Sequence, residues 1–222
     1  MRWKCASLLL PVCVLAHDPI STKITWCREI SRIVFAHCAS CHREGGSSFP
    51  LVTYRQARPW AVAIKDEALE RRMPPWGPVA GFGDFRDDQS LTETELELIA
   101  AWAEGGAPEG DPALLPPTPD FRKSAESPIP GGTEIVVDGR LELRRAIRLV
   151  AIRPGTLPAG ATLQVVARRP DGTIEPLLWL YDYQPRFSRT YVYRDAIALP
   201  AGTVVETSPA NGGTVVLIVS TQ

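Results

Sequence analysis

The 222-residue chain contains little histidine and methionine, two of the side chains that bind transition metals in proteins. Its three histidines all lie before residue 43, and its two methionines are Met1 and Met73. The net charge of −1 gives no basic excess of the kind that nucleic-acid-binding domains carry. No internal repeat is present, and beyond the N-terminus no apolar stretch is long enough to span a bilayer. These absences favour a soluble globular protein of one or two domains.

Residues 1–16 have the composition of a secretory signal peptide. Arg2 and Lys4 give a charged start, an apolar run follows at residues 8–15, and Ala16 ends a small-residue cleavage pattern. The apolar run is too short to cross a bilayer comfortably, although an uncleaved interfacial anchor is the alternative interpretation. We therefore expect a periplasmic or secreted protein with no membrane span after cleavage.

The segment Cys38-Ala39-Ser40-Cys41-His42 contains the C-x-x-C-H pattern of covalent haem attachment. Each thiol can form a thioether to one haem vinyl group, and the imidazole of His42 can take an axial position on the iron. A thioredoxin-type redox pair and a chance match are the alternatives. Because haem c is attached outside the cytoplasm, the predicted signal peptide supports the haem interpretation. We predict one covalent haem c, held by Cys38 and Cys41.

Apolar residues at helical spacing predict helices on both sides of this motif. The helix that leads into the motif contains Cys27, a thiol that we expect to be buried. A second helix is predicted from about Thr53 to Arg71, and Pro74-Pro75 prevents its continuation. A third begins near Ser90 or Thr92, since each of these residues starts a capping-box pattern.

Met73 is the candidate for the second axial ligand of the iron. It is the only methionine left after signal cleavage, and it lies in the loop Arg71-Arg72-Met73-Pro74-Pro75-Trp76, which two prolines stiffen. His and Met form a common axial pair in electron-transfer cytochromes. The alternative is a methionine that fills a gap in the core. His37 lies too near the attachment site to reach the opposite haem face easily, so we predict His42 and Met73 as the iron ligands.

Residues 24–107 resemble a small cytochrome c domain. The resemblance is carried by the C-x-x-C-H motif, residues 54–60, the R-R-M-P-P-W loop and residues 102–108. The likeness is closest to bacterial modules that are often fused to a copper-dependent monooxygenase-like domain. It implies a small all-α fold, covalent haem c with His42 and Met73 as ligands, and one-electron transfer.

The second half of the chain has β-strand patterning and follows a Pro-rich linker, residues 108–132. Period-two alternation and β-branched residues predict an antiparallel β-sandwich over residues 133–222. The predicted strands are 135–137, 141–152, 162–167, 177–183, 189–193, 203–206 and 214–220. The predicted fold class is therefore α + β multidomain, with a small all-α cytochrome c domain followed by the sandwich.

This half also resembles a domain of the copper type II, ascorbate-dependent monooxygenases. Residues 169–172, 177–178, 181–183, 191 and 199–203 carry the resemblance. In that family a His-x-His pair after a strand binds the catalytic copper, but the matching place here, residues 153–158, contains no histidine, and none follows His42. The resemblance therefore implies the sandwich fold without the copper chemistry, and we expect a non-catalytic docking module.

Together these features predict an electron-transfer protein rather than an enzyme, with a redox partner protein that docks on the sandwich. Three alternatives remain open: a haem enzyme or sensor for peroxide or a gas, an electron-donor subunit of a monooxygenase-like complex, and a sandwich that binds carbohydrate or protein. Trp179, Tyr181 and Tyr183 would serve such binding, although aromatic residues of a sandwich are more often in its core. A haem enzyme needs an open or labile sixth position, which Met73 would close.

Overall fold

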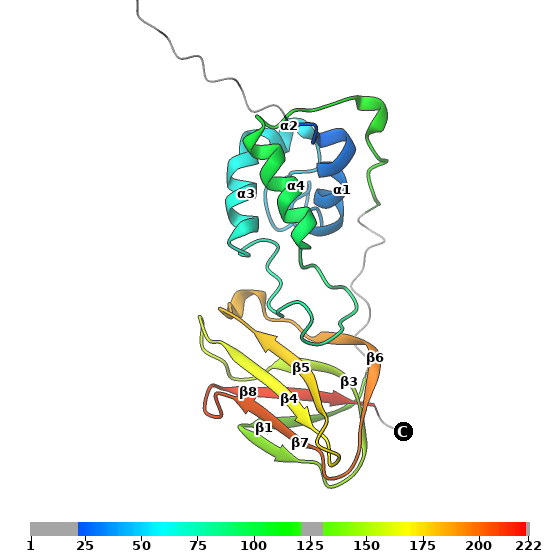
Figure 1. Ribbon diagram of the computed structural model, residues 1–222, viewed down its shortest axis with the longest axis vertical. Coiled ribbons are helices and arrows are strands. Elements are labelled where there is room, and N and C mark those ends of the chain that lie inside the picture. The colour runs from blue at the N-terminus through cyan, green and yellow to red at the C-terminus, as the bar shows by residue number, and fades with distance from the viewer. Residues whose placement is uncertain (1–21, 121–130, 221–222) are drawn as a thin grey trace, which may run out of the picture.

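The computed structural model of the protein describes residues 22–120 and 131–220 (Figure 1). Helices occupy the first of these parts, and two β-sheets occupy the second. The predicted signal peptide, residues 1–16, and the centre of the predicted linker lie outside the described residues. Within the described parts of the chain, no helix is both long and apolar enough to cross a bilayer.

Short helices make up the regular structure of residues 22–120. A continuous helical segment consists of α1 (Ser31–Ile33) between two π-helical turns, Trp26–Ile30 and Val34–Cys38. The remaining helices are α2 (Tyr54–Ala57), a 3₁₀ turn (Arg58–Trp60), α3 (Ala61–Leu69), α4 (Glu93–Glu104) and a second 3₁₀ turn (Pro112–Leu114). The structure shows few, short helices in this part of the chain. The identification of a small all-α cytochrome c domain stays a prediction.

The helix predicted from Thr53 to Arg71 is present, but it is interrupted and shorter. Thr53 caps it, because its hydroxyl accepts a hydrogen bond from the Gln56 N–H at 3.3 Å while the Gln56 side chain accepts one from the Thr53 N–H at 3.0 Å. Pro59 has no N–H to donate, and a 3₁₀ turn replaces the α-helical turn around it. The helix ends at Leu69, ahead of the prolines, and Arg71 has a left-handed φ of 55°.

Two tryptophans lie at the centre of the helical core. The rings of Trp26 and Trp102 are 1% and 0% exposed, and their centroids are 6.1 Å apart. The carbonyl of Pro108 accepts hydrogen bonds from the Trp26 N–H and from the Trp102 indole N–H, both at 3.0 Å. Cys27 is buried beside Trp26, as predicted. These contacts fasten the start of the motif-bearing helical segment to the chain just after α4.

Residues 131–220 form two four-stranded antiparallel sheets, which confirms the predicted antiparallel, β-rich second half. The strands are β1 (Thr133–Asp138), β2 (Arg140–Glu142), β3 (Ile147–Pro154), β4 (Leu163–Arg168), β5 (Ile174–Leu180), β6 (Tyr191–Leu199), β7 (Val204–Ser208) and β8 (Thr214–Val219). Their order is β1-β8-β3-β6 in one sheet and β2-β7-β4-β5 in the other. The prediction of one strand over residues 141–152 is wrong, because the chain leaves the sheet of β2 before it enters the sheet of β3.

The aromatic residues considered as binding groups differ in burial. Tyr183 is buried, Trp179 is half-buried, and Tyr181 is 68% exposed. Deeper in the core, the Tyr193 hydroxyl donates a hydrogen bond to the Leu177 carbonyl at 2.9 Å. The expectation of core aromatics therefore holds for Tyr183 and fails for Tyr181.

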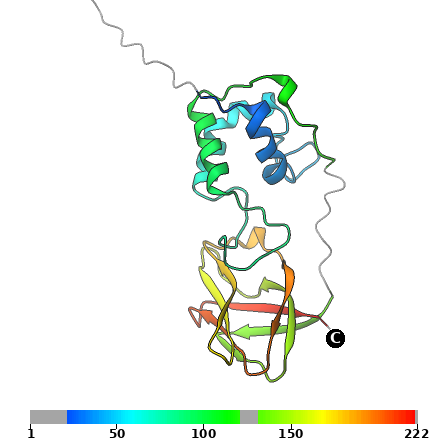
Figure 2. The same ribbon diagram turned by 45° about the vertical axis from the view of Figure 1, so that its right-hand side comes forward.

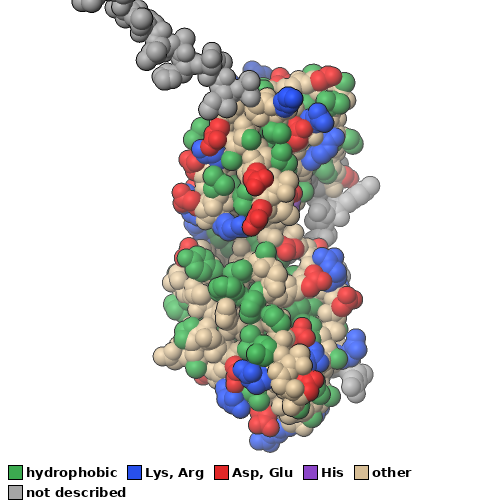
Figure 3. Space-filling view, in the orientation of Figure 1, with side chains coloured by type: hydrophobic (Ala, Val, Ile, Leu, Met, Phe, Trp, Pro, Cys, Tyr) green, Lys and Arg blue, Asp and Glu red, His purple; other side chains and the backbone are tan. Residues whose placement is uncertain are grey.

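Charges of both signs are interspersed on the face of the molecule that Figure 3 shows. On the face shown in Figure 3, Lys and Arg side chains alternate with Asp and Glu side chains over both parts of the chain. This distribution agrees with the net charge of −1 and gives that face no field of a single sign.

Candidate functional site

The C-x-x-C-H motif forms a tight turn at the C-terminal end of the first helical segment. The carbonyl of Cys38, the last helical residue, accepts hydrogen bonds from the N–H groups of Cys41 at 3.2 Å and His42 at 2.9 Å. Ala39 is fully buried in this turn. The structure therefore brings Cys38, Cys41 and His42 together.

The thiols of the motif differ from those of a thioredoxin-type pair. Cys38 and Cys41 are free, and Cys38 packs against the helical core. Burial, followed by the charges of Cys41 and Glu95, raises the pKa of the Cys38 thiol to about 12. Redox-active C-x-x-C pairs instead have a lowered thiol pKa at a helix N-terminus. Cys38 ends a helix, so its position does not favour thiol–disulfide chemistry.

The imidazole of His42 is held in an orientation suited to metal binding. Its Nδ1 lies 2.9 Å from the carbonyl oxygen of Phe49, and a protonated Nδ1 donates a hydrogen bond there. The lone pair then resides on Nε2, which is the usual arrangement of a metal-ligating histidine. The loop that supplies the Phe49 carbonyl folds back on the motif, since the Ser48 N–H donates to the Cys41 carbonyl at 3.2 Å. A Cβ at Gly46 would lie 2.2 Å from that same carbonyl oxygen, so this close approach requires glycine.

Aromatic rings beside His42 present an unusually apolar surface. The Phe49 ring packs edge-on against the imidazole at 4.9 Å between centroids, and the Trp60 ring lies 4.7 Å from the Phe49 ring. Phe49 and Trp60 are each 46% exposed. Large exposed aromatic side chains mark binding surfaces in many proteins. A flat apolar group next to His42 would cover these rings, so the residues at the motif fit a haem.

Met73 lies in a loop that contacts with Glu67 and Glu70 hold to the end of α3. The Met73 N–H donates a hydrogen bond to the Glu67 carbonyl at 3.1 Å. The Arg72 guanidinium pairs with both oxygens of the Glu67 carboxylate, at 2.9 and 2.8 Å, and it also contacts Glu70. The pKa of the Glu67 carboxyl is lowered, chiefly by the hydrogen bond from Arg72. These bonds hold the turn after α3 close to that helix.

Met73 also lines a cavity of about 710 Å³ between its loop and the sandwich. The loop contributes Pro74 and Trp76, and the sandwich contributes Tyr183 and Tyr191, among other residues. Neither the two cysteines of the motif nor His42 lines this cavity, so it does not join Met73 to the motif. Its size is within the range of small-molecule binding sites.

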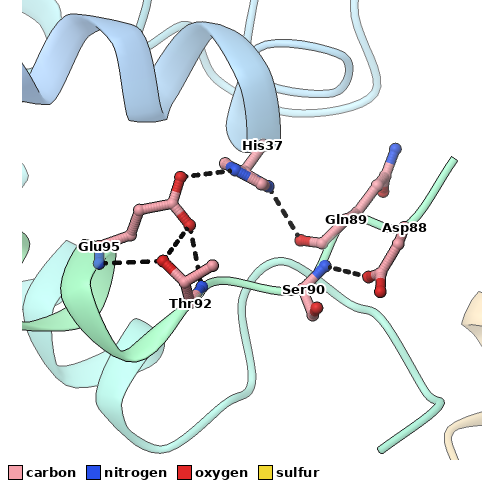
Figure 4. Close-up of polar contacts among 6 residues, drawn as sticks. All are labelled: His37, Asp88, Gln89, Ser90, Thr92 and Glu95. Atoms are coloured by element: carbon pink, nitrogen blue, oxygen red, sulfur yellow. Dashed lines mark hydrogen bonds and ion pairs between the residues drawn. The ribbon is translucent and has the colours of Figure 1, made fainter. Parts of the chain in front are cut away.

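Both ring nitrogens of His37 are occupied by protein partners. Its Nε2 lies 3.0 Å from the Glu95 carboxylate, and its Nδ1 lies 3.2 Å from the Gln89 carbonyl (Figure 4). The same carboxylate accepts hydrogen bonds from the backbone N–H and the hydroxyl of Thr92. Partial burial opposes ionisation of Glu95, but the bonds from Thr92 and the contact with His37 outweigh it and lower its pKa. The sequence does not indicate the partners of His37, although it contains the Thr92-x-x-Glu95 capping-box pattern.

The place that matches a copper-binding His-x-His pair carries other contacts. Arg153 forms an ion pair with Glu134 at 2.9 Å, and the Gly155 N–H donates to the Thr214 carbonyl at 2.8 Å. Within residues 22–120 and 131–220, no three His, Cys, Asp or Glu side chains cluster so that they could hold a metal ion directly. Comparisons with protein-family models, curated proteins and solved structures gave no match. The resemblances therefore depend on the motif residues alone.

Proposed function

We propose that this protein is a c-type cytochrome of the periplasm or the extracellular space that carries single electrons. The observation that carries the proposal is the geometry of His42, whose Nδ1 is bound to the Phe49 carbonyl beside two free thiols. Cys38 and Cys41 would hold one haem c through thioethers, and His42 Nε2 would be an axial ligand. The proposed domain is a small all-α cytochrome c domain over residues 24–107, supported by a helical core separate from that of the sandwich.

Met73 is the proposed sixth ligand of the iron. When bound, the haem supplies an iron that gains and loses one electron. The protein residues would orient the imidazole, cover the ring with the aromatic side chains of Phe49 and Trp60, and supply the Met73 thioether. A soft thioether favours the reduced metal, and a His/Met pair therefore raises the reduction potential. A protein-held sixth position also leaves no vacancy for peroxide.

A haem enzyme or gas sensor is the second candidate function, and the cavity beside Met73 favours it. Tyr183 and Tyr191 line that cavity together with Met73, so a small molecule held there would lie beside the proposed sixth ligand. This function requires the Met73 thioether to leave the iron. The carrier and the enzyme therefore differ in one measurable property, the strength of methionine ligation.

The replacement of Met73 by Leu in the full chain tests the proposal, because leucine keeps the size of the side chain and removes the sulfur. The wild type should show the long-wavelength absorption band of methionine-ligated ferric haem, and Met73→Leu should lose it. The potential of the variant should fall by on the order of 100 mV, and its ferrous iron should bind carbon monoxide. Leu69→Met, a control at the exposed end of α3, should retain the band. A wild type without the band, or a Met73→Leu variant that retains it, would refute methionine ligation.

Haem attachment is tested separately from ligation. The Cys38→Ala/Cys41→Ala double variant should release haem into acidified acetone, whereas the wild type should keep it in the protein fraction. The buried Cys27, replaced by Ala, serves as the matched control and should leave the haem covalently attached. Extraction of haem from the wild type would contradict thioether attachment.

A further inference from the structure

The segment from Trp76 to Arg86, here called the sandwich-bound loop, follows Met73 and leaves the helical part of the chain. Its backbone pairs with the edges of both sheets. The Val79 N–H donates to the Trp179 carbonyl at 2.8 Å, and the Arg86 N–H donates to the Val192 carbonyl at 2.8 Å. Antiparallel bridges join Pro78 to Leu180 and Phe85 to Tyr193.

The two paired strands are edges of their sheets. β5 ends the order β2-β7-β4-β5, and β6 ends the order β1-β8-β3-β6. Exposed edge strands are normally covered or blunted, because their free N–H and C=O groups recruit other strands. Figures 1 and 2 show the chain between α3 and α4 descending from the helices to this end of the sandwich. The sandwich-bound loop therefore covers both edges at once.

Two aromatic residues fasten the loop to the sandwich. Phe85 is 3% exposed and belongs to the sandwich core. Trp76 packs on that core, with its ring 5.4 Å from the Tyr191 ring and 6.3 Å from the Phe85 ring. The Arg189 guanidinium lies 5.6 Å from the Trp76 ring centroid, within the range of a cation–π contact. The anchor is thus built from the loop, β6 and the turn before β6.

Met73 lies between two fixed points. On the helical side its N–H is bound to the Glu67 carbonyl, and on the sandwich side Trp76 is anchored three residues later. Three residues span at most about 11 Å of chain, so the Met73 backbone cannot move far while both anchors hold. The Trp76 N–H also donates to the Pro74 carbonyl at 2.7 Å, which tightens the connection.

We infer that the β-sandwich positions the axial methionine, with Trp76 and Phe85 as its positioning residues. The inference depends on the proposed function, because it assigns the sandwich a role in the strength of the Met73–iron bond. A sandwich that holds the loop would limit the movement of the Met73 sulfur and would thereby favour bound over released methionine. A loosened loop releases the sulfur and opens the sixth position. The sandwich is then a determinant of ligation in addition to any docking role.

The test compares loop variants of the full chain by three readouts: the methionine–iron band, the reduction potential, and the rate of carbon monoxide binding to ferrous protein. Trp76→Ala should weaken the band, lower the potential and accelerate carbon monoxide binding by about tenfold or more. Trp76→Phe, which keeps an aromatic ring, should restore most of the wild-type behaviour. Val137→Ala is the control, because Val137 is buried in the same core on β1, at the opposite edge from β6. It should lower stability and leave all three readouts unchanged.

Gly77→Ala provides a second variant that removes no core side chain. A Cβ at this position would lie 2.8 Å from the Tyr191 hydroxyl oxygen and 3.1 Å from Leu180, so the loop must shift relative to these two buried side chains. It should accelerate carbon monoxide binding even if Trp76→Ala fails to fold. Wild-type readouts in Gly77→Ala, while Met73→Leu loses the band, would overturn this inference alone. A Met73→Leu variant with an unchanged band would instead overturn the proposed function.

Discussion

The Glu95 carboxylate joins the start of α4 to the end of the motif-bearing helix, and its removal should destabilise the helical part. One oxygen contacts His37 at 3.0 Å, and the other accepts bonds from the Thr92 N–H at 2.8 Å and the Thr92 hydroxyl at 2.9 Å. The side chain is 24% exposed. A single carboxylate therefore closes the capping box and fixes the residue next to Cys38.

Replacement of Glu95 by Gln retains the capping-box geometry and removes the charge. Hydrogen bonds to a charged group are about twice as strong as neutral ones, which contribute about 1 kcal/mol each. After a discount for partial exposure, the expected loss is about 1 kcal/mol. In a protein of this length, that loss lowers the melting temperature by roughly 2–4 °C. Glu97→Gln, at an exposed position of the same helix, should change stability little.

The loss should depend on pH in a defined direction. The pKa of Glu95 is lowered in the folded protein from an ordinary value of 4.5. Its stabilisation is therefore fully present above pH 4.5 and is lost as the pH falls through the folded-state pKa. Urea unfolding followed by far-ultraviolet circular dichroism should show a smaller difference between wild type and Glu95→Gln at about pH 3 than at about pH 7. An equal difference at both pH values would refute the ionic contribution of Glu95.

Four further outcomes are expected. Tyr193→Phe should lower the unfolding free energy by about 1–3 kcal/mol in urea titrations, because the buried Leu177 carbonyl loses its hydroxyl partner. Cys27 should react with iodoacetamide at least about tenfold more slowly in native protein than in urea, since burial raises the pKa of its thiol. Metal analysis of residues 133–222 expressed alone should find no stoichiometric copper, because this half of the chain contains no histidine and no methionine. Residues 133–222 expressed alone should unfold at lower urea than the sandwich of the full chain, since the core then lacks Phe85; the loss of a buried Phe costs about 3–5 kcal/mol.

Local features of the fold could be predicted from the sequence because their signals lie within a few residues. Thr92 and Glu95 form the predicted capping box of α4 within one turn. Ser90 starts the same pattern but does not cap the helix, which begins at Glu93, and its N–H donates to the Asp88 carboxylate at 2.8 Å. The proximity of Cys38 and His42 is also local, since one turn of backbone brings them together.

Long-range features could not be predicted in this way. The partners of His37 lie more than fifty residues away and have no spacing that marks them. Trp76 and Phe85 pack on strands about a hundred residues later, and the loop between them has neither a period-two pattern nor turns of a hairpin. The surroundings of Met73 follow from these packing contacts. The sequence therefore indicates that Met73 has a side chain suited to bind iron. The contacts that hold its loop in place are found only in the folded structure.

The position of the sandwich-bound loop bears on the role of the second half of the chain. Two of the four edge strands of the sandwich, β5 and β6, lie where one backbone can pair with both, and the segment after Met73 supplies that backbone. Phe85 packs in the sandwich core, and the Met73 N–H is bound to the Glu67 carbonyl. The chain between these two residues is therefore held at both ends. The loop that packs Phe85 into the sandwich core therefore also constrains Met73, and this constraint is the basis of the role proposed for the sandwich.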